Sequence, residues 1–258
     1  MASMSDLTES SQQVNNQRFN AEAAQWDANK KHAEGVTKAF DAIQRYIPAF
    51  ADGTSKALDV LEIGCGTGLL SFLLAPHVRS LVGVDTADAM VDAFNAKTAA
   101  FPDPCAANLA AVNVQVHSAD DVHLQGAAAA LALDRGESGE DLPYRFDLVV
   151  SHLTLHHIPE LGDLLRTLRD CLRPGGLLAL TDYEDFGEDA VAFHPASKRA
   201  GVERHGIRKR EMEDVIDGVG FNEVRVERAF SLRKEVETEG REGTREMDFP
   251  FLICLAKK

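Results

Sequence analysis

Three closely spaced glycines and an acidic residue follow one another at the end of an apolar run, and their spacing suits the binding of a nucleotide-like ligand. They are Glu62, Gly64, Gly66 and Gly68, with Cys65 inside the loop. Glycine lets the backbone turn tightly and approach a ligand closely where a helix begins. Ligands of open α/β sheets bind at this carboxyl end of a strand. We therefore expect these five residues to contact a ligand.

Two ligand classes fit such a loop, a dinucleotide and S-adenosylmethionine (SAM). The dinucleotide pattern is G-x-G-x-x-G, and here the third glycine comes one residue early. Glu62 would also repel a pyrophosphate. SAM has no phosphate and carries a sulfonium and an ammonium, which a nearby carboxylate attracts. Spacing and charge thus favour SAM over NAD.

A second acidic residue, Asp85, ends the next apolar run. It lies about 20 residues after Gly64, where a carboxylate can accept hydrogen bonds from both ribose hydroxyls of a nucleoside. Either cofactor needs that contact, so Asp85 indicates a nucleoside without choosing between them. Met90 follows on the next helix, where its thioether can contact adenine or simply pack in the core. Both roles remain open.

Methyl transfer from SAM requires a protein mainly to orient the acceptor, exclude water and, where needed, remove a proton. His152 follows the predicted strand Phe146–Ser151, and His205 lies in an irregular segment further along. We take both as candidate general bases, with a packing or solvated role as the alternative for each. No carboxylate lies among His152, His156 and His157, so we predict no metal site.

Short apolar runs alternate with helical segments, which is typical of a parallel sheet with crossover helices. We predict strands at Leu58–Ile63, Leu81–Asp85, Val112–His117, Phe146–Ser151, Gly176–Asp182, Asn222–Phe230 and Phe249–Ala256. We predict helices at Leu69–Pro76, Ala87–Ala99, Glu160–Leu172 and Lys209–Val219. The first, fourth and fifth strands are almost entirely apolar, as expected for strands buried on both faces.

Composition excludes several classes of partner. The formal charge of −14 opposes binding to nucleic acid, because phosphates are neutralised by clustered Lys and Arg. The four cysteines form no C-x-x-C pair, which suits a reducing compartment. No apolar run reaches the roughly 18 residues of a membrane span, and the polar start resembles no leader peptide. We expect a cytoplasmic protein without a membrane partner.

The motifs in order resemble those of class I SAM-dependent methyltransferases. They are Glu62-x-Gly64-x-Gly66-x-Gly68, Asp85-Thr86-x-x-x-Met90, Ser118-Ala119-Asp120-Asp121, Phe146-Asp147-Leu148-Val149-Val150 and Leu172-Arg173-Pro174-Gly175-Gly176. They are most similar to the branch of quinone-biosynthesis C-methyltransferases and many small-molecule methyltransferases. The resemblance implies an α/β, Rossmann-like fold with a seven-stranded, mostly parallel sheet, an antiparallel last strand and helices on both faces. It also implies SAM as the cofactor.

The same resemblance suggests further cofactor contacts, among them Thr86 and Ser151. Members often hold the adenine amino group with Asp where this chain has Ser118, so Ser118 or Asp120 takes that role, with the Ala119 amide facing the ring. Trp26 resembles part of a lid helix, where an anchor for its own helix is favoured over a ligand contact. The segment from Ser151 to Pro159 lacks the Asn/Asp-Pro-Pro-aromatic motif, which argues against amine and amide acceptors.

These features predict a disordered tail at 1–15 and one methyltransferase domain at 16–258. Within it we expect lid helices at 16–50 and a roof over the acceptor pocket at 183–207. We expect the segment 124–143 to be a surface insertion made of a crossover helix and a mobile acidic loop. A basic cluster at Arg204, Arg208, Lys209 and Arg210 could be solvated or attract an anionic acceptor. We expect a small-molecule acceptor and a monomer or homodimer. The alternatives are a protein methyltransferase, an NAD-dependent oxidoreductase and a non-catalytic SAM-binding protein.

Overall fold

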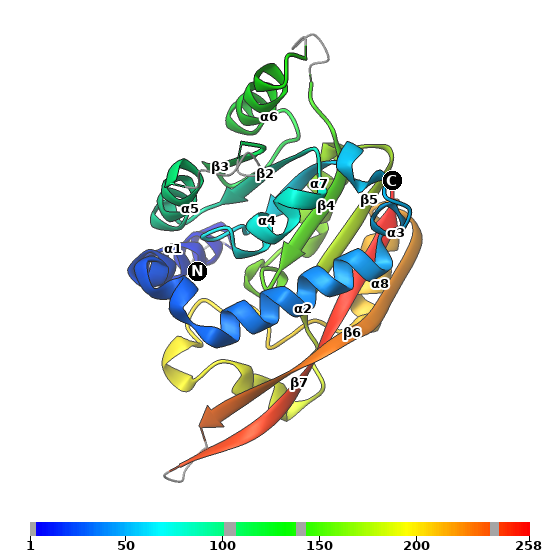
Figure 1. Ribbon diagram of the computed structural model, residues 1–258. Coiled ribbons are helices and arrows are strands. Elements are labelled where there is room, and N and C mark those ends of the chain that lie inside the picture. Colours follow the sequence, from blue (N-terminus) through cyan, green and yellow to red (C-terminus); the bar gives the residue numbers. More distant parts are fainter. Residues whose placement is uncertain (1–3, 101–106, 138–142, 238–242) are drawn as a thin grey trace.

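Seven strands form one mixed sheet in a computed structural model that describes residues 4–100, 107–137, 143–237 and 243–258 (Figure 1). The strands are β1 (Asp59–Ile63), β2 (Ser80–Asp85), β3 (Leu109–Asn113), β4 (Phe146–His152), β5 (Leu172–Tyr183), β6 (Asn222–Glu237) and β7 (Thr244–Lys257). They lie in the order β3-β2-β1-β4-β5-β7-β6. The pairs among β1 to β5 are parallel, and β7 runs antiparallel to both β5 and β6. The predicted Rossmann-like fold with an antiparallel last strand is confirmed.

Helices cover both faces of this sheet. They are α1 (Met4–Glu22), α2 (Lys30–Tyr46), α3 (Pro48–Ala51), α4 (Leu69–Leu74), α5 (Asp88–Ala100), α6 (Val122–Asp134), α7 (Leu161–Cys171) and α8 (Lys209–Gly218). Short 3₁₀ helices add η1 (Ala23–Ala28), η2 (Thr54–Ala57), η3 (Ala75–His77), η5 (Leu155–His157), η6 (Glu188–Phe193) and η7 (Ala196–Lys198). Within the described ranges, no helix is long and apolar enough to cross a membrane.

Alternate residues of β1 serve the two faces, as the two-residue period of a strand requires. Leu61 packs with α6, α7 and α8 in one core cluster, whereas Val60 packs with α2, α4 and α5 in the other. Figure 1 shows α2 running across its face of the sheet, while the β6–β7 ribbon extends beyond the other strands. Because β1 pairs in parallel with both β2 and β4, the carboxyl ends of these three strands lie at one edge of the sheet, where ligands bind in such sheets.

The third strand differs from its prediction, because β3 pairs with β2 over Leu109–Asn113 and ends before the predicted Val112–His117 does. Register with β2 decides this boundary, whereas the apolar pattern continues past the strand end. Residues 114–117 are consequently not part of the sheet.

The predicted disordered tail is wrong for most of its length, since residues 4–15 belong to α1. Polar tertiary contacts hold this helix. The Asn15 amide donates to the Gly201 carbonyl at 2.9 Å, and Gln12 donates to the Thr86 hydroxyl at 2.8 Å. Hydrophobic periodicity cannot reveal a helix that docks through amides.

The crossover helix predicted within 124–143 is present as α6, but it is part of the core and not a surface insertion. Asp121 caps α6 by accepting hydrogen bonds from the amides of His123 and Leu124, which starts the helix. Leu124 and Leu131 are then buried against the sheet, so α6 belongs to the core. Residues 138–142 of this segment lie outside the described ranges.

Candidate active site

A cavity of about 900 Å³ opens at the carboxyl ends of β1, β2 and β4. This is near the upper end of the range of small-molecule pockets, so it has room for a cofactor and an acceptor together. The predicted site residues that line it are Trp26, Glu62, Gly64, Cys65, Gly66, Asp85, Thr86, Met90 and His152. The predicted residues Gly68, Ser118, Ala119, Asp120, Ser151 and His205 do not line it.

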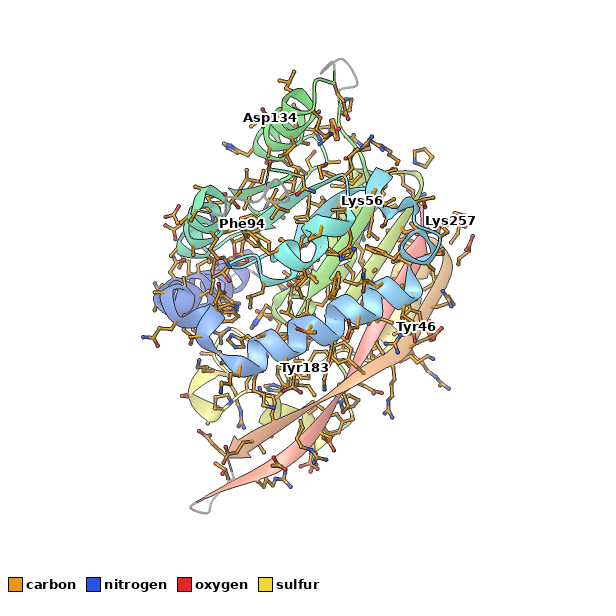
Figure 2. The ribbon with its side chains drawn as sticks, in the orientation of Figure 1. Tyr46, Lys56, Phe94, Asp134, Tyr183 and Lys257 are labelled. Atoms are coloured by element: carbon orange, nitrogen blue, oxygen red, sulfur yellow. The ribbon has the colours of Figure 1, made fainter. Side chains whose placement is uncertain are left out.

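Two glycines of the loop have different reasons for lacking a side chain. Gly66 adopts a φ of +53° and lines the cavity, and a Cβ there would meet no atom within 4 Å. That open space faces the position a ligand would take. Gly68 has a φ of +89°, and its Cβ would lie 2.5 Å from the ring of Phe94, which Figure 2 marks on α5. Gly68 is therefore needed for close packing under the loop.

Asp85 is held at the end of β2 by the backbone around it. Its carboxylate accepts hydrogen bonds from the amides of Gly66 at 2.8 Å and Ala87 at 2.9 Å. Burial raises its pKa above the ordinary value, although these amides favour the charged form. The carboxylate is thus fixed at the cavity wall directly beside the glycine loop, a place from which it can reach a ribose.

Glu62 is the second buried carboxyl group of this end of the cavity. It accepts a hydrogen bond from the Ser71 hydroxyl of α4. Burial, together with the nearby charge of Asp85, raises the pKa of Glu62 to about 8. A ligand with a positive charge next to Glu62 would favour its ionised form. SAM carries such charges, so the carboxyl groups of Glu62 and Asp85 fit this cofactor.

The residues predicted to contact adenine beyond β3 do not line this cavity. Ser118, Ala119 and Asp120 line a separate polar depression of about 330 Å³. Asp120 pairs there with Arg145 at 2.7 Å. The cavity wall is formed instead by Val114, Gln115, Val116 and His117. Because β3 ends at Asn113, residues 114–117 pass the cavity first, and the predicted residues come too late in the chain.

Ser151 is buried in the sheet, and its hydroxyl donates to the Ile63 carbonyl at 2.9 Å. This bond ties β4 to β1, so the residue positions the neighbouring strand ends. It does not itself face the cavity.

The N-terminal segment closes one side of the cavity. Trp26 lies against Phe19 and His32, with ring centroids 5.7 and 4.0 Å apart. The same cluster includes Met90, which is 2% exposed. Trp26 is therefore both an anchor for its own segment and part of the cavity wall, and the two predicted roles coincide in position.

The two histidines predicted as bases differ in placement. His152 lines the cavity, and its Nδ1 lies 2.9 Å from the Thr181 hydroxyl, while its buried Nε2 has no partner. Burial lowers its pKa to about 4. His205 does not line the cavity. Ile207, two residues later, forms a β-bridge with Glu184, which directly follows β5, and this pairing fixes the chain around His205. His205 is thereby removed from the candidate site.

A third histidine, His156, is paired with a buried carboxylate. Its Nδ1 lies 2.9 Å from Asp182, which also accepts hydrogen bonds from the amides of His156 and Tyr183 at 3.0 and 2.8 Å. This pairing puts the proton on Nδ1 and leaves the buried Nε2, which has no partner among the described residues, as a lone-pair acceptor. Burial lowers the pKa of His156 and raises that of Asp182 to about 6.

Sequence reasoning missed Asp182 as a partner of His156. The one available signal was a charged residue, Asp182, at the end of an otherwise apolar strand. Only the structure brings it to His156, 26 residues earlier in the chain.

His156, His157 and His194 place one nitrogen each within 4.8 Å of one another and so form a geometric candidate for a metal site. Charge argues against a cation there. Arg18 lies 3.5 Å from the Nε2 of His157, whose Nδ1 faces the Gly201 carbonyl at 3.2 Å. The charges of Arg18 and Arg204 also lower the pKa of His156. A metal ion would have to displace Arg18 and face these charges.

The sequence profile of a family described as "Methyltransferase domain" matches residues 13–226. This range covers most of the chain and includes the glycine loop and Asp85. The chain belongs to this methyltransferase family. It is a SAM-dependent methyltransferase, and the prediction of SAM rather than NAD is confirmed.

Curated relatives of this methyltransferase include an uncharacterized methyltransferase of Schizosaccharomyces pombe, 30% identical over 58% of this chain and 48% of that protein. A ubiquinone biosynthesis O-methyltransferase of Caulobacter vibrioides is 29% identical over 62% of this chain and 59% of its own length. The methyltransferase thus spans about half the length of the curated relatives it matches.

Solved structures resemble its fold at low sequence identity. Magnesium protoporphyrin IX methyltransferase of Synechocystis, with bound S-adenosylhomocysteine (SAH), superposes with a TM-score of 0.54 at 17% identity, covering 88% of this chain and 84% of that chain. The YcgJ protein of Bacillus subtilis gives 0.57 at 12% identity, covering 85% and 97%. Both share the Rossmann-like architecture of this methyltransferase.

Proposed function

We propose that this methyltransferase transfers the methyl group of SAM to a hydroxyl oxygen of a small-molecule acceptor, with His156 as the general base. The observation that carries the proposal is the His156–Asp182 pair on the wall of the cavity that the glycine loop also lines. A carboxylate that fixes the tautomer of a histidine and leaves its other nitrogen free is a recurring arrangement for proton abstraction.

The cofactor occupies the end of the cavity formed by β1 and β2. Gly66 leaves room for it, Asp85 accepts hydrogen bonds from its ribose hydroxyls, and Glu62 faces its ammonium group. Residues 114–117, with Met90 opposite, enclose the adenine. SAM supplies an activated methyl group, and the protein's task is to place and deprotonate the acceptor.

In the proposed step the acceptor hydroxyl lies between the cofactor methyl group and His156. Its oxygen attacks the methyl carbon, the sulfur–methyl bond breaks, and the electron pair stays on sulfur. The acceptor proton passes to the Nε2 of His156. Asp182 acts as a positioning residue: its carboxylate holds the Nδ1 proton at 2.9 Å and stabilises the imidazolium that forms.

Two further observations support a small hydroxylated acceptor. Relatives of this chain are named as O-methyltransferases of ubiquinone biosynthesis. The cavity is also enclosed by the N-terminal segment on one side and by Phe193 and His194 on the other, which leaves little room for a macromolecule. A protein acceptor is therefore disfavoured.

The test is a metabolite screen with methyl-labelled SAM, followed by identification of the methylated atom. We expect a product methylated on oxygen. A product methylated on nitrogen or carbon would overturn the hydroxyl assignment. Labelling of added proteins without labelling of any metabolite would overturn the small-molecule assignment.

A further inference from the structure

Four cationic side chains from four different elements face the acceptor end of the cavity. They are Arg18 of α1, Lys31 of α2, Lys198 of η7 and Lys234 of β6. Such a gathering is unusual in a chain with a formal charge of −14. Burial, together with the positive charges of Lys198 and Lys31, lowers the pKa of Lys234 to about 8.

Carboxylates pair with only some of these four cations. Lys198 pairs with Glu22 at 2.7 Å, and Lys31 pairs with Glu34 at 2.8 Å. Among the described residues, neither Arg18 nor Lys234 has a carboxylate within 4 Å. The charge of Glu22 acts on Arg18 as well as on Lys198, so within the described part of the chain neither of the half-buried cations Arg18 and Lys234 has a carboxylate of its own.

The protein contacts of Lys234 leave its charge unpaired. Its Nζ donates to the Phe193 carbonyl at 2.7 Å and lies 3.8 Å from the centre of the Phe193 ring. The ring stacks on Tyr183, marked in Figure 2, with centroids 4.0 Å apart. A carbonyl and a ring face hold an ammonium in place, but a buried charge still gains from an anion.

The hydrogen bonds of Arg18 in the same region go to uncharged groups. It donates to the Lys198 carbonyl at 2.7 Å and approaches the Nε2 of His157 at 3.5 Å. The basic cluster identified in the sequence does not contribute to this end of the cavity. Arg204 donates to backbone carbonyls of residues 155–159, and Arg208 pairs with Asp185 and Glu211.

We propose that Lys234 and Arg18 form an anion-binding subsite that holds a carboxylate group of the acceptor. The apolar side chains of Val36, Phe193 and Leu232 line the cavity beside it. The acceptor is therefore an apolar, ring-sized molecule with both a hydroxyl and a carboxylate. A charge-assisted hydrogen bond to Lys234 orients the molecule so that its hydroxyl faces His156.

The inference rests on the proposed function only in taking this cavity as the acceptor site. Its test is binding to the SAH complex, with no turnover. Failure of this test would leave methyl transfer through His156 standing, and a failed screen for O-methylation would leave the subsite standing.

The probes are labelled benzoate, benzamide and acetate, measured by equilibrium dialysis against the SAH-loaded enzyme. Benzoate and benzamide share a ring and differ in charge, whereas acetate carries the charge without the ring. We expect benzoate to bind at least about tenfold more tightly than either, because it alone satisfies the charge and the apolar wall. Equal binding of benzoate and benzamide, or no binding of benzoate, overturns the proposal. Acetate binding as tightly as benzoate indicates a site for free anions and also overturns it.

Variants assign the effect to Lys234. Lys234→Gln should abolish the preference for benzoate, Lys234→Arg should retain it, and the matched surface change Lys209→Gln on α8 should leave it intact. Unchanged SAH affinity in each variant shows that the fold survives. A preference for benzoate that persists in Lys234→Gln rules out this residue. Arg18→Gln then decides whether Arg18 shares the subsite, through a smaller loss of benzoate affinity.

Discussion

Thr67 in the glycine loop donates a hydrogen bond to the Asp27 carboxylate at the end of η1, with the two oxygens 2.5 Å apart. Lys97 of α5 binds the other oxygen of Asp27 at 2.6 Å. The N-terminal segment is thereby fastened to the cofactor loop next to Trp26, a wall residue of the cavity. Closure of this segment and binding of the cofactor should therefore be linked.

Thr67→Val removes this hydrogen bond with little change of shape. We expect SAH affinity to fall about three- to tenfold, a modest effect because Asp27 is 40% exposed and a bond to a charged group is worth about 1.5–3 kcal/mol when buried. The emission of Trp26, the only tryptophan, should shift as the segment loosens. Thr37→Val on α2 is the matched control. Wild-type affinity and emission in Thr67→Val would show that the two elements are not coupled.

Asp85→Ala should weaken SAH binding by at least about tenfold, since two charge-assisted hydrogen bonds to ribose are lost. Calorimetry measures the change, and a thermal melt checks the fold, because the amides of Gly66 and Ala87 also lose their acceptor. The exposed Asp92→Ala on α5 should leave the affinity unchanged. A folded Asp85→Ala protein that binds SAH like the wild type would remove Asp85 from the site.

Glu62 makes the stability of the ligand-free enzyme depend on pH. Its pKa is raised to about 8 in the folded state, so the folded protein holds a proton that the unfolded chain has already lost. Stability therefore falls as pH rises toward 8, by up to about 1.4 kcal/mol per pH unit. Asp182, with a pKa of about 6, and Lys234, with a pKa of about 8, also titrate near this range, so it is the comparison of the wild type with Glu62→Gln from pH 6.5 to 8 that isolates the contribution of Glu62.

Thermal melts over that range should show a declining midpoint in the wild type and a flatter profile in Glu62→Gln. SAH binding below pH 8 should also release a proton in the wild type only, which calorimetry in two buffers of different ionisation enthalpy detects. Identical pH profiles for the two proteins would show that Glu62 is already ionised in the empty site.

His156→Ala should lower turnover by about 10²–10⁴, the usual contribution of a general base, with SAH affinity nearly unchanged. His152→Ala separates the two buried histidines, because His152 lacks a carboxylate partner among the described residues and should lose less turnover. The exposed His123→Ala on α6 serves as the control. If His152→Ala loses turnover and His156→Ala does not, the base has been assigned to the wrong residue.

Asp182→Asn tests the positioning role of this carboxylate. Asparagine keeps a single oxygen, which can accept only one of the backbone amides of His156 and Tyr183, and it no longer holds a charge beside the imidazole. Turnover should fall by about tenfold or more, and the ascending limb of the pH–rate profile should shift to lower pH, because an imidazole without the neighbouring carboxylate has a lower pKa. A loss of turnover with an unchanged pH profile would indicate a purely structural role.

Local pattern sufficed for the sheet and for the cofactor end of the site. A buried strand, its following glycines and the acidic end of the next strand are close in sequence, and parallel pairing of β1 with β2 brings Gly66 to Asp85 without further information. Even here the third strand was misplaced by several residues, because pairing sets a strand end and apolar alternation does not. The predicted adenine contacts Ser118 and Asp120 consequently fall outside the cavity, which residues 114–117 line at this place.

The acceptor end depended on tertiary structure alone. Asp182 reaches His156 because β5 lies beside β4, and the unpaired cations of Arg18 and Lys234 meet only where α1 and β6 approach the same cavity. In sequence each is an ordinary polar residue with many possible partners. Their chemistry depends on how deeply each side chain is buried and on which residues surround it in the fold. Neither can be read from a single segment of the chain.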